Sequence, residues 1–124
     1  METPSEMATL KRGDIVLVPF PFTDLSSTKV RPAVIVSTDP QETDVTVAFI
    51  SSAVPDAEGP FDKVLGEESP DFPKTGLKRS SVFRMSKLVT LERTTILRRL
   101  GRTSVEIQKQ LDGRLMLALG LSQA

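Results

Sequence analysis

Two reactive residue types, cysteine and histidine, are missing from this 124-residue chain. Without cysteine it has no disulfide, thiolate zinc site or cysteine nucleophile, which fits a reducing compartment such as the cytoplasm. Without histidine it has no Ser-His-Asp triad, no histidine pair for RNA cleavage and no HExxH zinc site. No apolar run approaches the roughly 20 residues of a membrane span, and the N-terminus is too polar for a signal peptide. We therefore expect a cytoplasmic protein that has no membrane partner.

The formal net charge is zero, but the charges are distributed unevenly along the chain. Residues 1–73 carry 5 basic and 13 acidic side chains, whereas residues 74–124 carry 11 basic and 3 acidic ones. Such an asymmetry points either to a polyanion partner or to two halves that pack together and neutralise each other. The sequence by itself leaves both interpretations open.

The length predicts one domain, which we place at residues 13–124 after a flexible tail at residues 1–12. Apolar and β-branched runs predict strands at 14–20, 31–37, 44–50, 61–65, 80–84 and 87–91. Residues 94–100 fit either a strand or a turn of helix, and the proline-rich stretch 53–76 reads as a long excursion without an α-helix.

The C-terminal segment has the pattern of an amphipathic helix. Thr103 and Glu106 fit a capping box as N-cap and N3 residues, and Gly120 fits a C-terminal stop. One face of the predicted helix would carry Ile107, Leu111, Leu115, Ala118 and Leu119. Several short strands followed by one such helix predict a small open β-barrel, or a twisted antiparallel sheet, that the helix covers.

Few residues remain that could carry chemistry. The acidic groups Glu67–Glu68 with Asp71, and Asp56 with Glu58, match no metal-binding pattern, and we expect a solvated acidic loop there. Arg31, at the mouth of a strand, is either a surface residue or a guanidinium that clamps a phosphate. Ser51 and Ser52 end another strand, where hydroxyls either cap a loop or bind a phosphate or a 2′-OH.

Several stretches, taken together and in order, resemble the MazF/PemK family of toxin–antitoxin ribonucleases. The resemblance covers nearly the whole chain, from about Lys11 to Leu121. It is carried by Lys11-Arg-Gly-Asp-Ile-Val-Leu-Val-Pro-Phe20, Arg31-Pro-Ala-Val-Ile-Val-Ser37, Val47-Ala-Phe-Ile-Ser51, Gly76-Leu77 with Ser80-Ser-Val82, and Met85-Ser-Lys-Leu-Val-Thr-Leu-Glu-Arg93 leading into Arg98-Arg-Leu-Gly101 and the terminal helix.

The resemblance implies a mainly β fold, an SH3-like barrel with a C-terminal helix, and a homodimer. It also implies cleavage of single-stranded RNA with sequence preference and without metal or cofactor. The 2′-OH would attack the adjacent phosphate and leave a 2′,3′-cyclic phosphate and a 5′-OH end. The family's catalytic arginine and hydroxyl residue map onto Arg31 and Ser51, where serine replaces the commoner threonine.

The same resemblance suggests further residues that would contact RNA. On this reading the charge asymmetry gains a meaning, because cations could line one groove and hold RNA phosphates while an acidic antitoxin competes for it. With tryptophan and tyrosine absent, base stacking would fall to phenylalanine or arginine, and we consider Phe20 and Phe22, with core packing as the alternative. The expected substrate-binding residues are Lys29, Ser52, Arg84, Ser86, Lys87, Phe22 and Asp24.

One departure from the family pattern keeps other functions open. Some members carry Arg-x-Asp where this chain has Arg84-Met85-Ser86, so a carboxylate base is missing at Ser86. The chain could therefore be a weakened nuclease that binds RNA without cutting it. Another alternative is a toxin that binds gyrase through the end of its C-terminal helix, as CcdB-type toxins do, for which Arg31 would be inessential.

Overall fold

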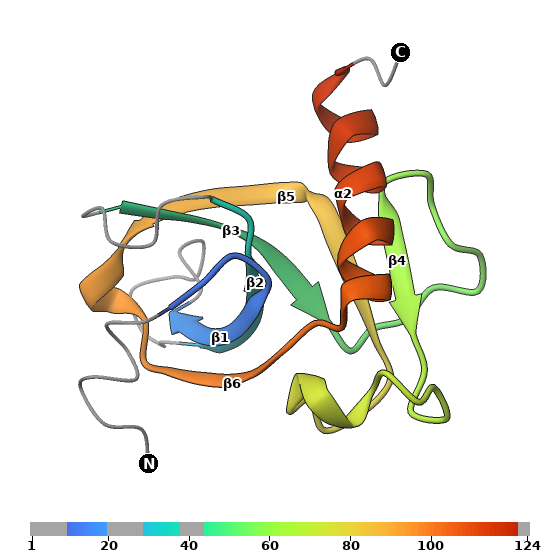
Figure 1. Ribbon diagram of the computed structural model, residues 1–124, viewed down its shortest axis with the longest axis horizontal. Helices are drawn as coiled ribbons and strands as arrows, with labels where there is room; N and C mark the ends of the chain where they lie inside the picture. Colours follow the sequence, from blue (N-terminus) through green and yellow to red (C-terminus); the bar gives the residue numbers. More distant parts are fainter. Residues whose placement is uncertain (1–9, 20–28, 38–43, 122–124) are drawn as a thin grey trace.

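The protein is described by a computed structural model that covers residues 10–19, 29–37 and 44–121. Its sheet is antiparallel, with the strand order β4-β5-β3-β2-β1-β6 (Figure 1). In chain order the elements are β1 (Asp14–Pro19), β2 (Val30–Ile35), β3 (Asp44–Ser51), β4 (Asp62–Leu65), the 3₁₀ turn η1 (Pro73–Thr75), β5 (Ser81–Glu92), the 3₁₀ turn η2 (Arg93–Thr95), β6 (Arg98–Arg102) and the helix α2 (Val105–Leu119).

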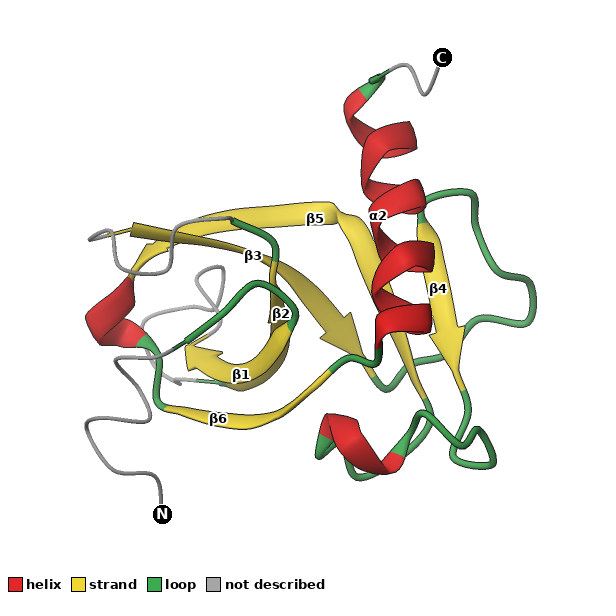
Figure 2. Ribbon diagram, viewed as in Figure 1, coloured by secondary structure: helices red, strands yellow, loops and turns green. Residues whose placement is uncertain are grey.

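The sheet is curled (Figure 1), and apolar residues fill both of its faces. Successive side chains of a strand point to opposite faces, so neighbours such as Ile15 and Val16 enter different cores. One core lies between the sheet and α2 and contains Phe83, Met85 and Leu111; the other lies inside the curl. Figure 2 shows the sheet curling into a half-barrel, with α2 against the β4–β5 end. The predicted mainly β fold with a C-terminal helix is confirmed.

The strand predictions hold for β1 to β4, with ends that shift by a residue or two. The two short strands expected at 80–84 and 87–91 form one continuous strand, β5, which pairs with β3 and β4. The ambiguous stretch 94–100 contains both of the predicted forms, since η2 is followed by β6. Within 53–76 the chain forms β4 and η1 and no α-helix.

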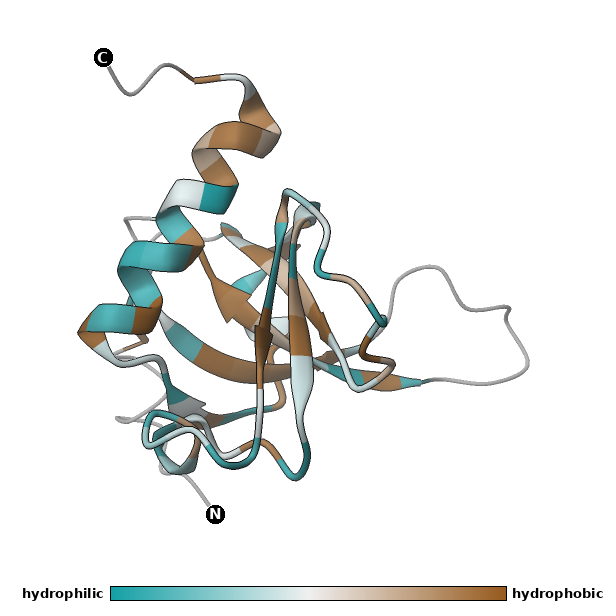
Figure 3. Ribbon diagram, turned by 90° about the vertical axis from the view of Figure 1, so that its right-hand side faces the viewer, coloured by the Kyte–Doolittle hydropathy of each residue, from teal (hydrophilic) through white to brown (hydrophobic). Residues whose placement is uncertain are grey.

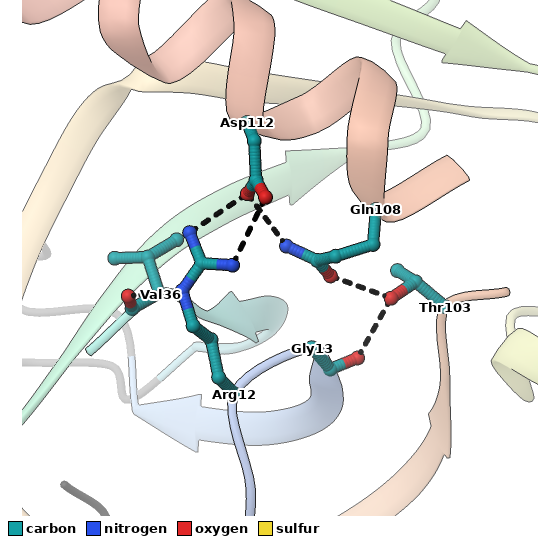
Figure 4. A network of polar contacts seen from close by, with 6 residues as sticks. All are labelled: Arg12, Gly13, Val36, Thr103, Gln108 and Asp112. Atoms are coloured by element: carbon teal, nitrogen blue, oxygen red, sulfur yellow. Dashed lines mark hydrogen bonds and ion pairs between the residues drawn. The ribbon is translucent and has the colours of Figure 1, made fainter. Parts of the chain in front are cut away.

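The start of α2 differs from the predicted capping box. Ser104, not Thr103, is the N-cap, because its hydroxyl accepts a hydrogen bond from the Ile107 N–H at 3.1 Å. The N3 residue is therefore Ile107, and Glu106 lies one position earlier. Thr103 instead has its hydroxyl near Gly13 O, at 3.3 Å, and near Gln108 Oε1, at 2.7 Å (Figure 4).

The apolar face of α2 was predicted correctly only for the first part of the helix. Ile107 and Leu111 are buried, and Leu115 packs against the core, but Leu119 is 53% exposed. The last turns extend beyond the sheet and are apolar (Figure 3). Gly120 ends the helix in the left-handed conformation, as predicted, with φ of 71°.

The packed part of the chain includes residues that were predicted to lie in the tail. Leu10 is 1% exposed, and the Arg12 guanidinium binds both carboxylate oxygens of Asp112 on α2, at 2.7 and 3.2 Å (Figure 4). Arg12 also donates to Val36 O, so it joins the sheet to the helix. No helix in the described segments has the length and apolar character needed to cross a bilayer.

Candidate functional site

The pairing of β2 with β3 brings Arg31 and Ser51 together. The antiparallel register sets Ala33 opposite Phe49 and Ile35 opposite Val47. Continuing this register by two residues sets Arg31 opposite Ser51, on the same face of the sheet. Both residues line one cavity of about 460 Å³.

A large bulge in β5, with four residues opposite one of β3, supplies the other polar residues of this cavity. Ala48 pairs with Leu88 and Ile50 pairs with Phe83, so the four residues 84–87 face only Phe49. Bulges bend a strand and redirect its side chains, and β5 changes direction between its two paired parts (Figure 1). Arg84, Ser86 and Lys87 therefore line the cavity together with Arg31 and Ser51.

Arg84 is held from the neighbouring strand. Asp62 of β4 lies directly opposite Arg84, and its Oδ1 is 3.4 Å from the Arg84 Nε in an ion pair. The Asp62 side chain is only 16% exposed, so this pair is less screened than a surface pair. The Asp62 backbone oxygen accepts a hydrogen bond from Arg114 of α2 at 3.2 Å, which ties this part of the site to the helix.

Glu58 completes the connection to α2. Its carboxylate accepts hydrogen bonds from the Val64 N–H, at 2.7 Å, and from Arg114, at 3.2 Å. Burial by itself would raise the pKa of Glu58, but these two hydrogen bonds and the charges of Lys63 and Arg114 outweigh it and leave the pKa below its ordinary value. Glu58 is thus held as a carboxylate that orients Arg114.

The hydroxyl of Ser51 already takes part in the local turn. Its oxygen accepts a hydrogen bond from the Ala53 N–H at 3.0 Å, as the loop-capping interpretation predicts. A hydroxyl that accepts one hydrogen bond can still donate its own hydrogen, so the turn contact does not prevent Ser51 from binding an anion. Arg31 is exposed, and its Nη1 donates to Val30 O at 3.3 Å.

A second cavity of about 520 Å³ continues from the first and shares Arg31, Ile50 and Ser51 with it. We call the two cavities together the basic groove. Its cationic lining residues are Arg31, Lys78, Arg79, Arg84, Lys87 and Arg98. Among the described residues that line it there is no aspartate or glutamate. Such a concentration of positive charge attracts polyanions, so the polyanion interpretation of the charge asymmetry applies to this face.

Of the residues predicted for the site, Arg31, Ser51, Ser52, Arg84, Ser86 and Lys87 line the basic groove. Lys29 is exposed just before β2, and neither cavity has it in its lining. Phe20, Phe22 and Asp24 lie outside the described residues. The sequence interpretation missed Asp62 and the cations Lys78, Arg79 and Arg98. The Lys78–Arg79 pair beside the matched Gly76–Leu77 segment was the available signal.

The acidic loop residues serve local structure. Glu67 and Ser80 exchange two hydrogen bonds, in which each backbone N–H donates to the other's side chain. In the part of the chain that the structure describes, no three acidic residues come together in a way that could hold a metal ion.

Comparison with known proteins identifies relatives of this chain. The family model described as the PemK-like, MazF-like toxin of type II toxin–antitoxin systems matches residues 11–119. None of the curated protein sequences matches significantly.

Solved structures share the fold at low sequence identity. An endoribonuclease in complex with its cognate antitoxin, from a mycobacterial species, has a TM-score of 0.70 at 18% identity over 94% of this chain and 100% of that one. Toxin MazF-mt6 of Mycobacterium tuberculosis has a TM-score of 0.69 at 20% identity, over 88% of this chain and 98% of its own. A MazE–MazF structure from Deinococcus radiodurans has a TM-score of 0.68 at 18% identity, over 91% and 98%. At these identities the likeness establishes the fold.

Proposed function

Because the chain belongs to the family of PemK-like, MazF-like toxins of type II toxin–antitoxin systems, we propose that it is an endoribonuclease that cleaves single-stranded RNA. The observation that carries the proposal is the convergence of Arg31, Ser51, Arg84 and Lys87 on one cavity. These side chains come from three strands and are far apart in sequence. Solved structures of the same fold are described as endoribonucleases, which agrees with this function.

The proposed reaction takes its nucleophile from the substrate. The 2′-oxygen forms a bond to the adjacent phosphorus, the bond from phosphorus to the 5′-oxygen breaks, and the products are a 2′,3′-cyclic phosphate and a 5′-OH end. Arg31 stabilises the charge that develops on the phosphate oxygens, and the Ser51 hydroxyl donates a hydrogen bond to them. The 2′-OH gives up its proton as its oxygen attacks, and the 5′-oxygen gains a proton as it leaves.

The proposal extends to the substrate and the partners. We propose mRNA in the cytoplasm as the substrate, no metal or cofactor, and a homodimer as the working form. A cognate antitoxin with an acidic segment would inhibit by occupying the basic groove. The mycobacterial structure that shares this fold is described as an endoribonuclease in complex with its cognate antitoxin, which supports a partner of this kind.

The test is cleavage of a long single-stranded RNA in excess EDTA by the wild type and by Arg31→Ala. Discrete fragments from the wild type alone, with cyclic phosphate ends, are the expected result. Equal cleavage by both proteins would overturn the role of Arg31. RNA binding without any cleavage would instead identify a weakened module, and Ser86→Asp would then be the variant to test for restored cleavage.

One observation favours a second candidate function, binding to gyrase through the end of the C-terminal helix. Leu117 and Leu121 are 59% and 56% exposed where α2 extends beyond the sheet (Figure 3). Large exposed apolar surfaces often mark protein interfaces. Under this function Arg31→Ala would leave toxicity unchanged, and gyrase would be recovered with the wild type but not with Leu117→Ser.

A further inference from the structure

The basic groove extends well beyond Arg31 and Ser51. Its second cavity is bounded by β6, by the start of β2 and by the segment that follows η1. Lys78, Arg79 and Arg98 bring three further cations to it, and Leu77 and Leu100 add apolar surface. This cavity is larger than the one at Arg84, so it has room for a second group of the size of a nucleotide phosphate.

Close backbone contact holds the segment that carries Lys78 and Arg79 in place. Gly76 has a φ of 72°, and a Cβ there would overlap the carbonyl of Leu100; a Cβ on Gly101 would overlap the carbonyl of Lys74. Two glycines thus allow the η1 segment to lie directly on β6. The Ser81 hydroxyl also donates to Arg79 O at 2.8 Å. The cations of this segment are therefore attached to a fixed backbone.

The charges of this cavity are not used to stabilise the fold. Considering only residues that the structure describes, Lys78, Arg79 and Arg98 take part in no ion pair. All three side chains are exposed to solvent. Cations that are clustered, exposed and not balanced by carboxylates repel one another, and an anion bound between them relieves this repulsion.

We propose that Lys78, Arg79 and Arg98 form a second phosphate-binding subsite, which holds an RNA phosphodiester next to the one at Arg31 and Ser51. This inference rests on the proposed function. Arginine and lysine contacts to phosphate position a strand without reading its bases. The subsite therefore anchors RNA of any sequence, and it strengthens binding only for strands long enough to occupy both cavities.

The test uses the full chain and fully 2′-O-methylated single-stranded RNA, which has no free 2′-OH and stays intact. The variant is Lys78→Ala/Arg79→Ala. The matched control is Lys11→Ala/Lys109→Ala, which removes two positive charges outside the groove. We expect Kd for a long strand to rise about tenfold or more in the groove variant, because charge-assisted hydrogen bonds are lost. The slope of log K against log[salt] should become shallower by about 0.7, because one phosphate contact on a single strand is lost.

The other outcomes separate this inference from the proposed function. If the groove variant binds long strands as the control does, the second subsite does not exist, while the nuclease proposal stands on wild-type cleavage. If the groove variant changes which sequences are cut, the three cations read bases and the phosphate assignment is wrong. If the wild type neither binds nor cuts RNA, the proposed function fails and the subsite fails with it.

Discussion

Cationic side chains occur in two different settings in this molecule. In one setting, basic residues form ion pairs that each join the N-terminal and C-terminal parts of the chain: Arg12–Asp112, Arg84–Asp62, Arg99–Asp14 and Arg114–Glu58. In the basic groove, the cations gather around two cavities whose described lining contains no carboxylate. The first setting neutralises charge within the fold, and the second presents charge to a ligand.

The difference explains why one net charge of zero was compatible with two interpretations. The halves do pack together and neutralise each other: acidic residues of β1, β4 and the adjoining loop pair with arginines of the C-terminal half, and Arg12 pairs with Asp112 of that half. Three cations that form no ion pair with a described residue, Lys78, Arg79 and Arg98, lie together in the groove. Arg84 belongs to both settings, because it lines the groove and also pairs with Asp62.

The largest effect is expected from Arg31→Ala in the groove. Cleavage of single-stranded RNA should fall by about 10²–10³-fold, the usual loss when a donor to a developing oxyanion is removed. The side chain is exposed, so the free energy of unfolding should change by no more than about 0.5 kcal/mol. Cleavage is measured in single turnover and stability by urea unfolding. Arg102→Ala, an exposed cation on β6 outside the groove, is the control and should cleave normally.

Arg12→Ala should show the opposite result. It removes a bidentate ion pair to Asp112 and a hydrogen bond to Val36 O, so the free energy of unfolding should fall by about 1–2 kcal/mol. Cleavage per folded molecule should stay at the wild-type level, because Arg12 is not among the residues that line the groove. Urea unfolding and a single-turnover assay at the same temperature measure both. A loss of cleavage without a loss of stability would contradict the assignment of Arg12 to the structural ion pairs.

Asp62→Asn tests the residue pair that links the settings. The substitution keeps the shape of the side chain but removes the charge that holds Arg84. An ion pair between a partly exposed arginine and a mostly buried aspartate contributes up to about 1 kcal/mol. We expect kcat to fall about two- to fivefold, and KM to fall as well, since a negative charge near the groove is lost. The same substitution in an Arg84→Ala background should have no further effect on kcat. An equal effect in both backgrounds would mean that Asp62 does not act through Arg84.

The strands and the C-terminal helix could be predicted from the sequence because period-two and period-3.6 apolar patterns directly reflect burial. Arg31 and Ser51 could be predicted as a pair only through a family resemblance, since they lie 20 residues apart and meet through the β2–β3 register. The bulge at 84–87 leaves no mark in the pattern of a strand, and the sequence therefore suggested two strands instead of β5.

Other features depend on contacts that no local pattern contains. Ser104 caps α2 because Thr103 is engaged with Gly13 and Gln108, whereas the spacing to Glu106 favoured Thr103. Lys78 and Arg79 face the groove because Gly76 and Gly101 allow η1 to lie on β6. Residues of this kind become site candidates only when the packing of distant segments is known.

The smallest effect concerns Glu58 and the pH dependence of stability. Because its pKa is lowered in the folded protein, ionised Glu58 stabilises the fold above its unfolded value of 4.5, and this contribution is lost as the pH falls through the folded pKa. Glu58→Gln should therefore unfold more easily than the wild type at about pH 7, and the difference should shrink below about pH 4. Urea unfolding midpoints at both pH values measure the difference.

Comparing Glu58→Gln with the wild type at each pH isolates Glu58, because the two proteins share all their other carboxylates. Glu68→Gln, at an exposed position in the turn after β4, controls for the loss of one surface charge. Glu58 acts through Arg114, which also donates to Asp62 O, so Glu58→Gln should change stability more than it changes cleavage. If the difference from wild type were the same at both pH values, the ionised carboxylate would contribute nothing, and its hydrogen bond to Val64 alone would hold the loop.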